Sequence, residues 1–146
     1  MSRGRWGVPP RPKLHLVDAN IILRYLIGDS PVQAAKSMEL MERLEAGVER
    51  AEILESVVAE AVWTLESFYK VSRPEIAERL AAILNFRGVL AAKKRILISA
   101  LARFGSTSAD FVDCLLAAQA QQRNLTVYSF DAKDFRRLGV AWEAPA

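Results

Sequence analysis

The stretch Leu14-His15-Leu16-Val17-Asp18-Ala19-Asn20 guides the interpretation of the rest of the chain. A short apolar run ends at the carboxylate of Asp18, and a helical pattern begins just afterwards at Ile21. In an open α/β sheet, ligands bind at the edge where the carboxyl ends of parallel strands meet. The sequence therefore predicts either a ligand-facing acid at residue 18 or, in the simpler alternative, a helix N-cap.

Short apolar segments alternate with longer amphipathic segments along the remainder of the chain. This alternation predicts an α/β fold: a three-layer α/β/α arrangement with a small, mainly parallel sheet of roughly four to five strands. The expected strands are Leu14–Val17, Ala51–Leu54, Val89–Ala91, Thr126–Phe130 and Val140–Trp142. The expected helices are Ile21–Ile27, Pro31–Leu44, Val57–Lys70, Pro74–Leu84, Lys93–Phe104, Asp110–Gln122 and Asp131–Leu138.

Length and composition indicate a single globular domain. The chain has 146 residues, of which 51% are hydrophobic and 25% charged. No apolar run approaches the roughly 20 residues of a membrane span, and no secretory signal is visible. One cysteine, Cys114, excludes an internal disulfide framework and favours a reducing compartment. We therefore expect a cytoplasmic protein with no membrane partner.

The net charge of +3 is unevenly distributed. We expect residues 1–13 to form a disordered basic leader and residues 14–146 to form the folded domain, because the leader is rich in Gly and Pro. Without the four bases of the leader, the net charge of the rest is −1; these bases are Arg3, Arg5, Arg11 and Lys13. The span 79–109 contains bases and no acid, which suggests either a polyanionic partner or a solvated face.

Further acids are expected near Asp18. Asp110 and Asp113 are three residues apart at a helix start, so they share a face at its positive end, although both would also serve as helix-stabilising acids. Asp131 follows a predicted strand, as Asp18 does. Two acids at strand ends on one sheet edge form a more specific pattern than either acid alone. Periodicity does not select Glu60, because it falls outside the apolar stripe of its helix like other surface acids.

Four short motifs resemble those of PIN-domain ribonucleases, especially toxins of the VapC type. Asp18-Ala19-Asn20 is similar to the opening motif of that family. The segment Val57–Leu65 is similar to the second motif, in which a helix carries the acid, here Glu60. The segment Asp110–Ala118 resembles the third motif, whose principal acid falls on Asp113.

Ser129-Phe130-Asp131 resembles the fourth motif. The resemblance runs from about Leu14 to Val140, with the motifs in the family's order. Cys114 stands where the family usually has a small residue such as Ala, and Ser129 stands where Thr is common. Neither departure removes a carboxylate.

The resemblance implies a cluster of carboxylates that binds Mg²⁺ or Mn²⁺ and hydrolyses RNA phosphodiesters. The implied catalytic and metal-binding residues are Asp18, Glu60, Asp113 and Asp131, and the implied substrate-positioning residues are Asn20, Asp110 and Ser129. Asn20 would position Asp18 or a phosphate, with a helix N-cap as its alternative role. Hard oxygen ligands suit Mg²⁺, and crowded carboxylates would have raised pKa values without a cation.

The resemblance also implies partners: RNA as substrate, a small antitoxin protein that covers the acidic cleft, and a second copy in a homodimer. The predicted helices Val57–Lys70 and Pro74–Leu84 carry apolar residues that would supply such surfaces, or would simply be core.

Other reaction classes lack the residues they need. A metal-free ribonuclease would need a histidine for proton transfer, and the single histidine, His15, lies inside a predicted strand. Zinc sites need several Cys or His ligands, and no phosphate-binding Gly-rich loop ending in Lys is present. The alternative from another class is a non-catalytic domain of the same fold that binds RNA or protein.

Overall fold

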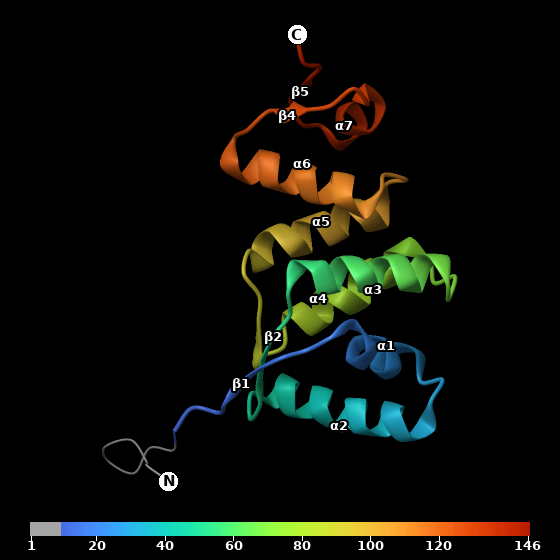
Figure 1. Cartoon of the computed structure of the whole chain (residues 1–146), viewed down its shortest axis with the longest axis vertical. Helices are drawn as coiled ribbons and strands as arrows, with labels where there is room; N and C mark the ends of the chain where they lie inside the picture. Colours follow the sequence, from blue (N-terminus) through green and yellow to red (C-terminus); the bar gives the residue numbers. More distant parts are fainter. Residues whose placement is uncertain (1–9) are drawn as a thin grey trace.

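The first sheet of the protein contains the motif strand. The computed structural model describes residues 10–146, and its strands β1 (Leu14–Leu16), β2 (Arg50–Glu52) and β3 (Val89–Leu90) form a parallel sheet in the order β1-β2-β3 (Figure 1). Leu14 lies opposite Arg50 across β1 and β2. Because β1 pairs only with β2, one edge of β1 is left without a neighbouring strand in this sheet.

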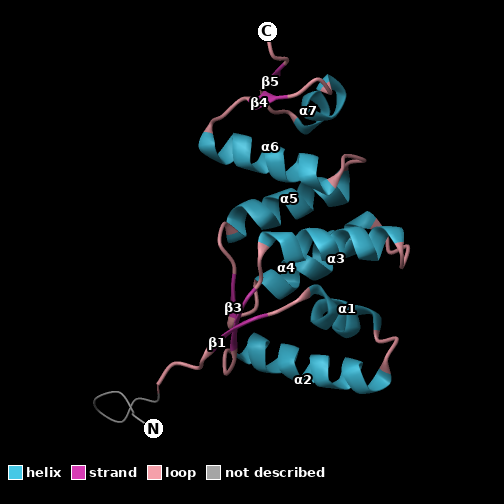
Figure 2. Ribbon diagram, in the orientation of Figure 1, coloured by secondary structure: helices cyan, strands magenta, loops and turns pink. Residues whose placement is uncertain are grey.

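The second sheet lies near the C-terminus. It consists of β4 (Val127–Tyr128) and β5 (Trp142–Glu143), which are also parallel, with Val127 opposite Trp142. Figure 2 shows how little of the described chain is strand compared with helix. Here too, β4 has one partner and one open edge.

Seven helices account for most of the described segment. Several begin and end where the sequence has capping residues: one begins with Pro31 at its first position and ends before Gly47, whose φ of 80° suits a residue without a Cβ. The helices are α1 (Ala19–Ile27), α2 (Pro31–Ala46), α3 (Glu55–Ser67), α4 (Arg73–Leu84), α5 (Lys94–Ser106), α6 (Phe111–Arg123) and α7 (Ala132–Leu138).

The helices are stacked along the long axis of the molecule. Figure 1 shows α2 and α1 near one end, α3 to α6 in the middle, and α7 with β4 and β5 at the other end. Buried residues such as Leu44, Leu65 and Leu101 belong to one continuous core. Gly105 permits α5 to lie close to α4, because a Cβ at this position would be 2.8 Å from the Cβ of Ala77.

The expected α/β fold with small parallel sheets is confirmed, with one difference in the strand arrangement. Instead of one sheet of four to five strands, the strands divide into sheets of three and two. The middle helices lie between the two groups of strands, and no hydrogen bond joins β1 to β4 within residues 10–146.

Element boundaries differ from the expected ones by a few residues. The strand expected at Thr126–Phe130 is limited to β4, and the last strand lies at Trp142–Glu143 instead of Val140–Trp142. The helix expected to reach Lys70 ends at Ser67, and Lys70 has a φ of 57°. A left-handed residue cannot continue a right-handed helix.

Most of the predicted leader, residues 1–9, lies outside the described residues. Residues 10–13 form an irregular segment that leads into β1, and the guanidinium of Arg50 donates a hydrogen bond to the carbonyl of Pro12 at 3.4 Å. The division of the chain at residue 13 therefore stays a prediction. Within residues 10–146, none of the helices has the length and apolar character needed to cross a lipid bilayer.

Candidate active site

Asp18 links β1 to α1 and caps the helix. Its Oδ1 accepts a hydrogen bond from the backbone N–H of Ile21 at 3.2 Å, so the capping role considered from sequence is real. The cap occupies one carboxylate oxygen, and the other has no hydrogen-bond partner among residues 10–146. Asn20 is the second residue of α1 and is exposed. Because Asp18 is the N-cap, that alternative role for Asn20 does not apply.

Asp110 and Asp113 lie at the start of α6, as expected. Asp110 occupies the N-cap position, but its side chain makes no capping hydrogen bond. Asp113 is half-buried in the first turn. Burial raises the pKa of the Asp113 carboxyl above its usual range, and the negative charges of Asp110, Asp134 and Asp131 raise it further. A bound cation would therefore reduce the electrostatic repulsion between Asp113 and the neighbouring carboxylates.

Ser129 and Asp131 follow β4 in the segment that leads into α7. The backbone N–H of Asp131 donates to the Ser129 hydroxyl at 2.9 Å, which fixes the turn between β4 and α7. Asp131 occupies the N-cap position of α7 without a capping hydrogen bond from its own side chain. The negative charge of Asp131 contributes to the raised pKa of Asp113, as the smallest of its causes.

Glu60 is exposed on α3 and, within the described segment, takes part in no salt bridge or side-chain hydrogen bond. The α3 acid that faces α6 is Glu66. It lines a pocket of about 520 Å³ together with Asp110 and Asp113, but its carboxylate is bound by Arg73 at 2.7 Å. The helical wheel could not separate these acids, and the structure does not bring Glu60 to Asp113.

Arg73 is a residue that the sequence did not reveal. Its guanidinium donates to the carbonyls of Thr107 at 3.1 Å and Ala109 at 2.7 Å, and it lies 4.1 Å from the centre of the Phe104 ring. Together with its ion pair to Glu66, these contacts fix the turn that leads into α6. A lone Arg before a proline carries no sequence signal for this positioning role.

Cys114 follows Asp113 and points into the core. It is fully buried, and burial raises the pKa of its thiol to about 11. The Cys at this motif position is therefore a packing residue beside the acids.

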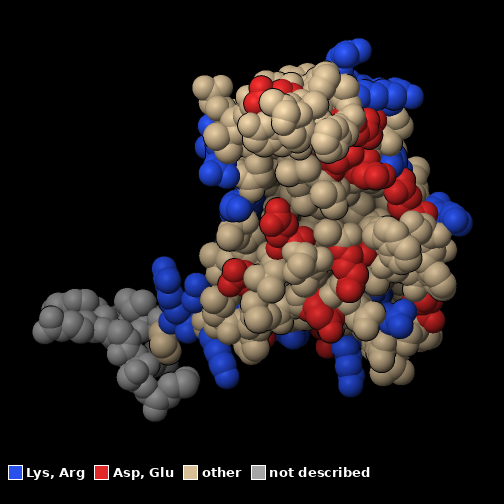
Figure 3. Space-filling view, turned by 45° about the horizontal axis from the view of Figure 1, so that its top comes forward, with Lys and Arg blue, Asp and Glu red and all other residues tan. Residues whose placement is uncertain are grey.

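The predicted acids do not form one cluster, and Glu60 lines neither of the two pockets that other predicted acids line. Asp113, Asp110 and Asp131 lie together around the start of α6, whereas Asp18 lines a separate pocket between α1 and α2. Among residues 10–146 no group of three or more His, Cys, Asp or Glu is arranged to hold one metal ion. Figure 3 shows acidic side chains spread over the middle of one face, with Lys and Arg mainly around its margins.

Comparison with known families bears directly on this arrangement of acids. The family model of the PIN domain matches residues 15–141, which is most of the chain. The chain belongs to the PIN-domain family. This PIN domain is also similar to a VapC ribonuclease of Aquifex aeolicus (strain VF5), with 26% identity over 127 residues that cover 86% of this chain and 93% of the relative.

The donor chemistry of this PIN domain suits a hard divalent cation. Carboxylate oxygens are the ligands that Mg²⁺ and Mn²⁺ prefer, and burial together with the neighbouring negative charges raises the pKa of the Asp113 carboxyl. The neighbouring acids come from the start of α6, where Asp110 lies, and from the start of α7, where Asp131 precedes the helix and Asp134 lies within it. Asp18 and Glu60 would have to move closer to Asp113 and Asp131 for all four predicted acids to bind one ion.

Proposed function

We propose that this PIN domain is a metal-dependent endoribonuclease and the toxin of a type II toxin–antitoxin pair. The observation that carries the proposal is the family match over residues 15–141 in a chain that has an acid at every family motif. The similarity to a VapC ribonuclease supports RNA as the substrate. We also propose that the protein acts in the cytoplasm.

The proposed catalytic and metal-binding residues are Asp18, Glu60, Asp113 and Asp131. A bound Mg²⁺ or Mn²⁺ would supply a water-derived nucleophile and would offset charge on the phosphate. Asp113 is the acid whose surroundings most favour a cation. The proposed substrate-positioning residues are Asn20, Asp110 and Ser129.

We infer that the active state pairs the open edge of β1 with the open edge of β4 of the same chain. Both strands expose large side chains: Leu16 of β1 is 67% exposed and Tyr128 of β4 is 71% exposed. An exposed apolar strand edge favours pairing with another strand. In a parallel pair the carboxyl ends coincide, so Asp18 and Asp131 would reach the same sheet edge.

The proposed partners are RNA, a small antitoxin protein and a second copy of the chain. Two aromatic side chains support a protein-binding surface on and after α3, because Trp63 is 66% exposed and Phe68 is 71% exposed. Of the two alternatives given by the sequence, a binding surface or the core, neither side chain belongs to the core.

The experiment is cleavage of structured RNA by the purified full chain. We expect cleavage with Mg²⁺ or Mn²⁺, none with EDTA, and a loss of about 100-fold or more in Asp18→Asn, because the lost carboxylate acts on developing charge. Glu60→Gln should show a similar loss. The matched control is Glu55→Gln, an exposed acid of the same helix, which should cleave normally.

Cleavage that persists in EDTA and in Asp18→Asn would contradict metal-acid catalysis. Absence of cleavage for every RNA tested, with either ion, would instead favour the non-catalytic binding domain.

A further inference from the structure

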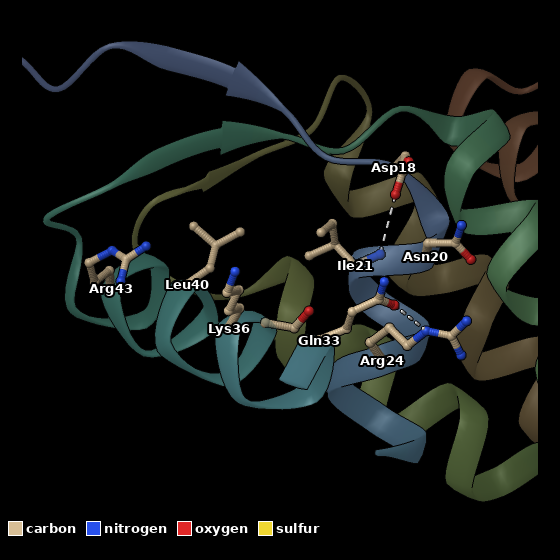
Figure 4. A pocket seen from close by; sticks show the side chains of 9 residues that line it. Asp18, Asn20, Ile21, Arg24, Gln33, Lys36, Leu40 and Arg43 are labelled. Carbon is tan, nitrogen blue, oxygen red and sulfur yellow. Dashed lines mark hydrogen bonds between the residues drawn. The ribbon is translucent and has the colours of Figure 1, made fainter. Parts of the chain in front are cut away.

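A pocket of about 450 Å³ opens beside Asp18, between α1 and α2 (Figure 4). This volume falls within the range of about 300–1,000 Å³ that is usual for ligand sites. One wall is α2, whose pocket-lining residues recur at helical spacing from Gln33 to Arg43. The other wall is the start of α1, with Asp18 and Asn20.

The α2 wall is basic. Lys36 lines the pocket, is exposed, and forms no salt bridge with any residue of the segment 10–146. Arg43 lies two turns further along and has only a loose pair with Glu49, at 3.4 Å. Two cations on one helix face beside a cavity favour an anionic ligand.

The end of the pocket at Arg24 is held in place by side-chain contacts. Arg24 donates to Gln33 Oε1 at 3.0 Å and to Asp29 at 2.7 Å, and the Tyr69 hydroxyl donates to Asp29 at 2.9 Å. Because its charge is already paired, Arg24 orients Gln33 and contributes less to anion binding. The amide NH₂ of Gln33 has no side-chain partner within residues 10–146 and is free to donate.

The remaining lining combines apolar and amide groups. Ile21 and Leu40 are half-buried and give the pocket an apolar surface, while Asn20 and Gln33 provide donors and acceptors. A nucleotide has matching parts: a flat base with hydrogen-bonding edges, and a phosphate for the cations. Amide side chains are the groups that read base edges by paired hydrogen bonds.

We propose that this pocket binds a nucleotide of single-stranded RNA next to the bond that is cleaved, with its phosphate on Lys36 and Arg43 and its base edge on Gln33. The inference rests on the proposed function, because Asp18 at the pocket rim is a proposed metal ligand. An acidic peptide would satisfy the cations but would leave the amide pair and the apolar surface without a role.

The test measures binding in EDTA, where metal-dependent cleavage is absent, with a fluorescein-labelled single-stranded RNA of ten nucleotides and fluorescence anisotropy. Lys36→Gln should raise Kd about three- to tenfold, since it removes one phosphate contact. The slope of log K against log salt concentration should fall by about 0.7. The matched control is Arg123→Gln, an exposed cation in the last turn of α6, which should bind as the wild type does.

A second variant separates base recognition from charge. Gln33→Ala should change the relative affinities for ten-nucleotide homopolymers of A, C, G and U and should leave the salt slope unchanged. Both α2 positions are exposed, so neither substitution disturbs the core, and circular dichroism checks the fold.

Unchanged Kd, salt slope and homopolymer preference in both variants would overturn the assignment. So would a loss of polyglutamate binding in Lys36→Gln with RNA affinity intact, because the pocket would then serve a protein. If no RNA is cleaved but both variants change RNA binding as expected, the assignment of the pocket to an RNA nucleotide stands, whereas its place beside a cleaved bond and the proposed catalytic function fail. If cleavage requires metal but the variants bind as wild type, only the pocket assignment fails.

Discussion

Asp113 is the residue on which opposing electrostatic effects are concentrated. The N-terminal end of α6 favours a negative charge there. Burial, followed by the charges of Asp110, Asp134 and Asp131, raises the pKa of its carboxyl, so the unfavourable effects dominate. The ionised form of this carboxyl therefore lowers the stability of the folded protein, as is common for groups at functional sites.

This pKa shift predicts a pH-dependent gain in stability for Asp113→Asn without divalent ions. Because the pKa of Asp113 is higher in the folded than in the unfolded chain, ionisation lowers the free energy of unfolding as pH rises above the usual Asp value. Asp113→Asn should therefore raise Tm at pH 7, and the gain should shrink towards about pH 4. Thermal unfolding at several pH values measures this.

Asp29 supplies a control of opposite sign. The hydrogen bond from Tyr69, together with Arg24, lowers the pKa of the Asp29 carboxyl. Its contribution to stability is present above the unfolded pKa and is lost as pH falls, so Asp29→Asn should lower Tm at pH 7 and have less effect near pH 4. A lower Tm for Asp113→Asn at pH 7 would contradict the interpretation of the acidic group.

Sequence reasoning predicted some of the contacts around the candidate site and missed others for physical reasons. Asp113 and Asp131 were expected near each other, because a helix start and a strand end at one edge are local patterns. Glu60 came only from family resemblance, since every exposed acid of α3 has the same helical periodicity. Arg73 could not be found, because its carbonyl partners lie more than thirty residues away in sequence.

At the scale of elements, the alternation of strands and helices was predictable, but the pairing of strand edges was not. Apolar runs mark strands through local side-chain periodicity. Whether β1 lies beside β4 depends on contacts between residues more than a hundred positions apart. The sequence therefore predicted the strands and their parallel direction, but it did not predict that they divide into two sheets.

The proposed pairing of β1 with β4 predicts an unusual sensitivity at Leu16. A Lys at a residue that is 67% exposed should cost within about 0.5 kcal/mol if the edge stays open. If β4 covers this edge in the active state, Leu16→Lys should reduce RNA cleavage at least about tenfold, because the ammonium would be desolvated. Steady-state cleavage rates measure the effect.

Val48→Lys is the matched control, since Val48 is 62% exposed in the turn after α2 and belongs to no strand. It should leave the cleavage rate within about twofold of the wild type. Equal rates for the two variants would argue that the edge of β1 remains open during catalysis.

At the scale of the whole molecule, the question is whether one chain supplies a complete site. Two edges in one chain need no second copy in order to meet, so their pairing does not depend on protein concentration. We therefore expect pairing within the chain, even though the middle helices separate the two sheets in the described arrangement.

Two measurements, the oligomeric state and the complementation of two inactive variants, test whether the protein is a dimer in which each chain forms its own site. Size-exclusion chromatography with light scattering should give twice the chain mass, and Phe68→Ser, which removes an aromatic ring that is 71% exposed, should shift the protein towards monomer. A wild type that is monomeric would contradict the proposed dimer surface. Refolding Asp18→Asn together with Asp113→Asn should give no active enzyme, because each chain lacks one acid; recovery of cleavage would show that the site is shared between copies.

The buried thiol of Cys114 has a practical consequence for all of these measurements. With a pKa of about 11 and no exposed surface, it forms almost no thiolate at neutral pH. Among the described residues it is also the only cysteine. A cysteine introduced on the edge of β1 or β4 would therefore be the single site that a maleimide dye labels in the native protein, so the movement of the two edges can be followed by fluorescence without first removing the native thiol.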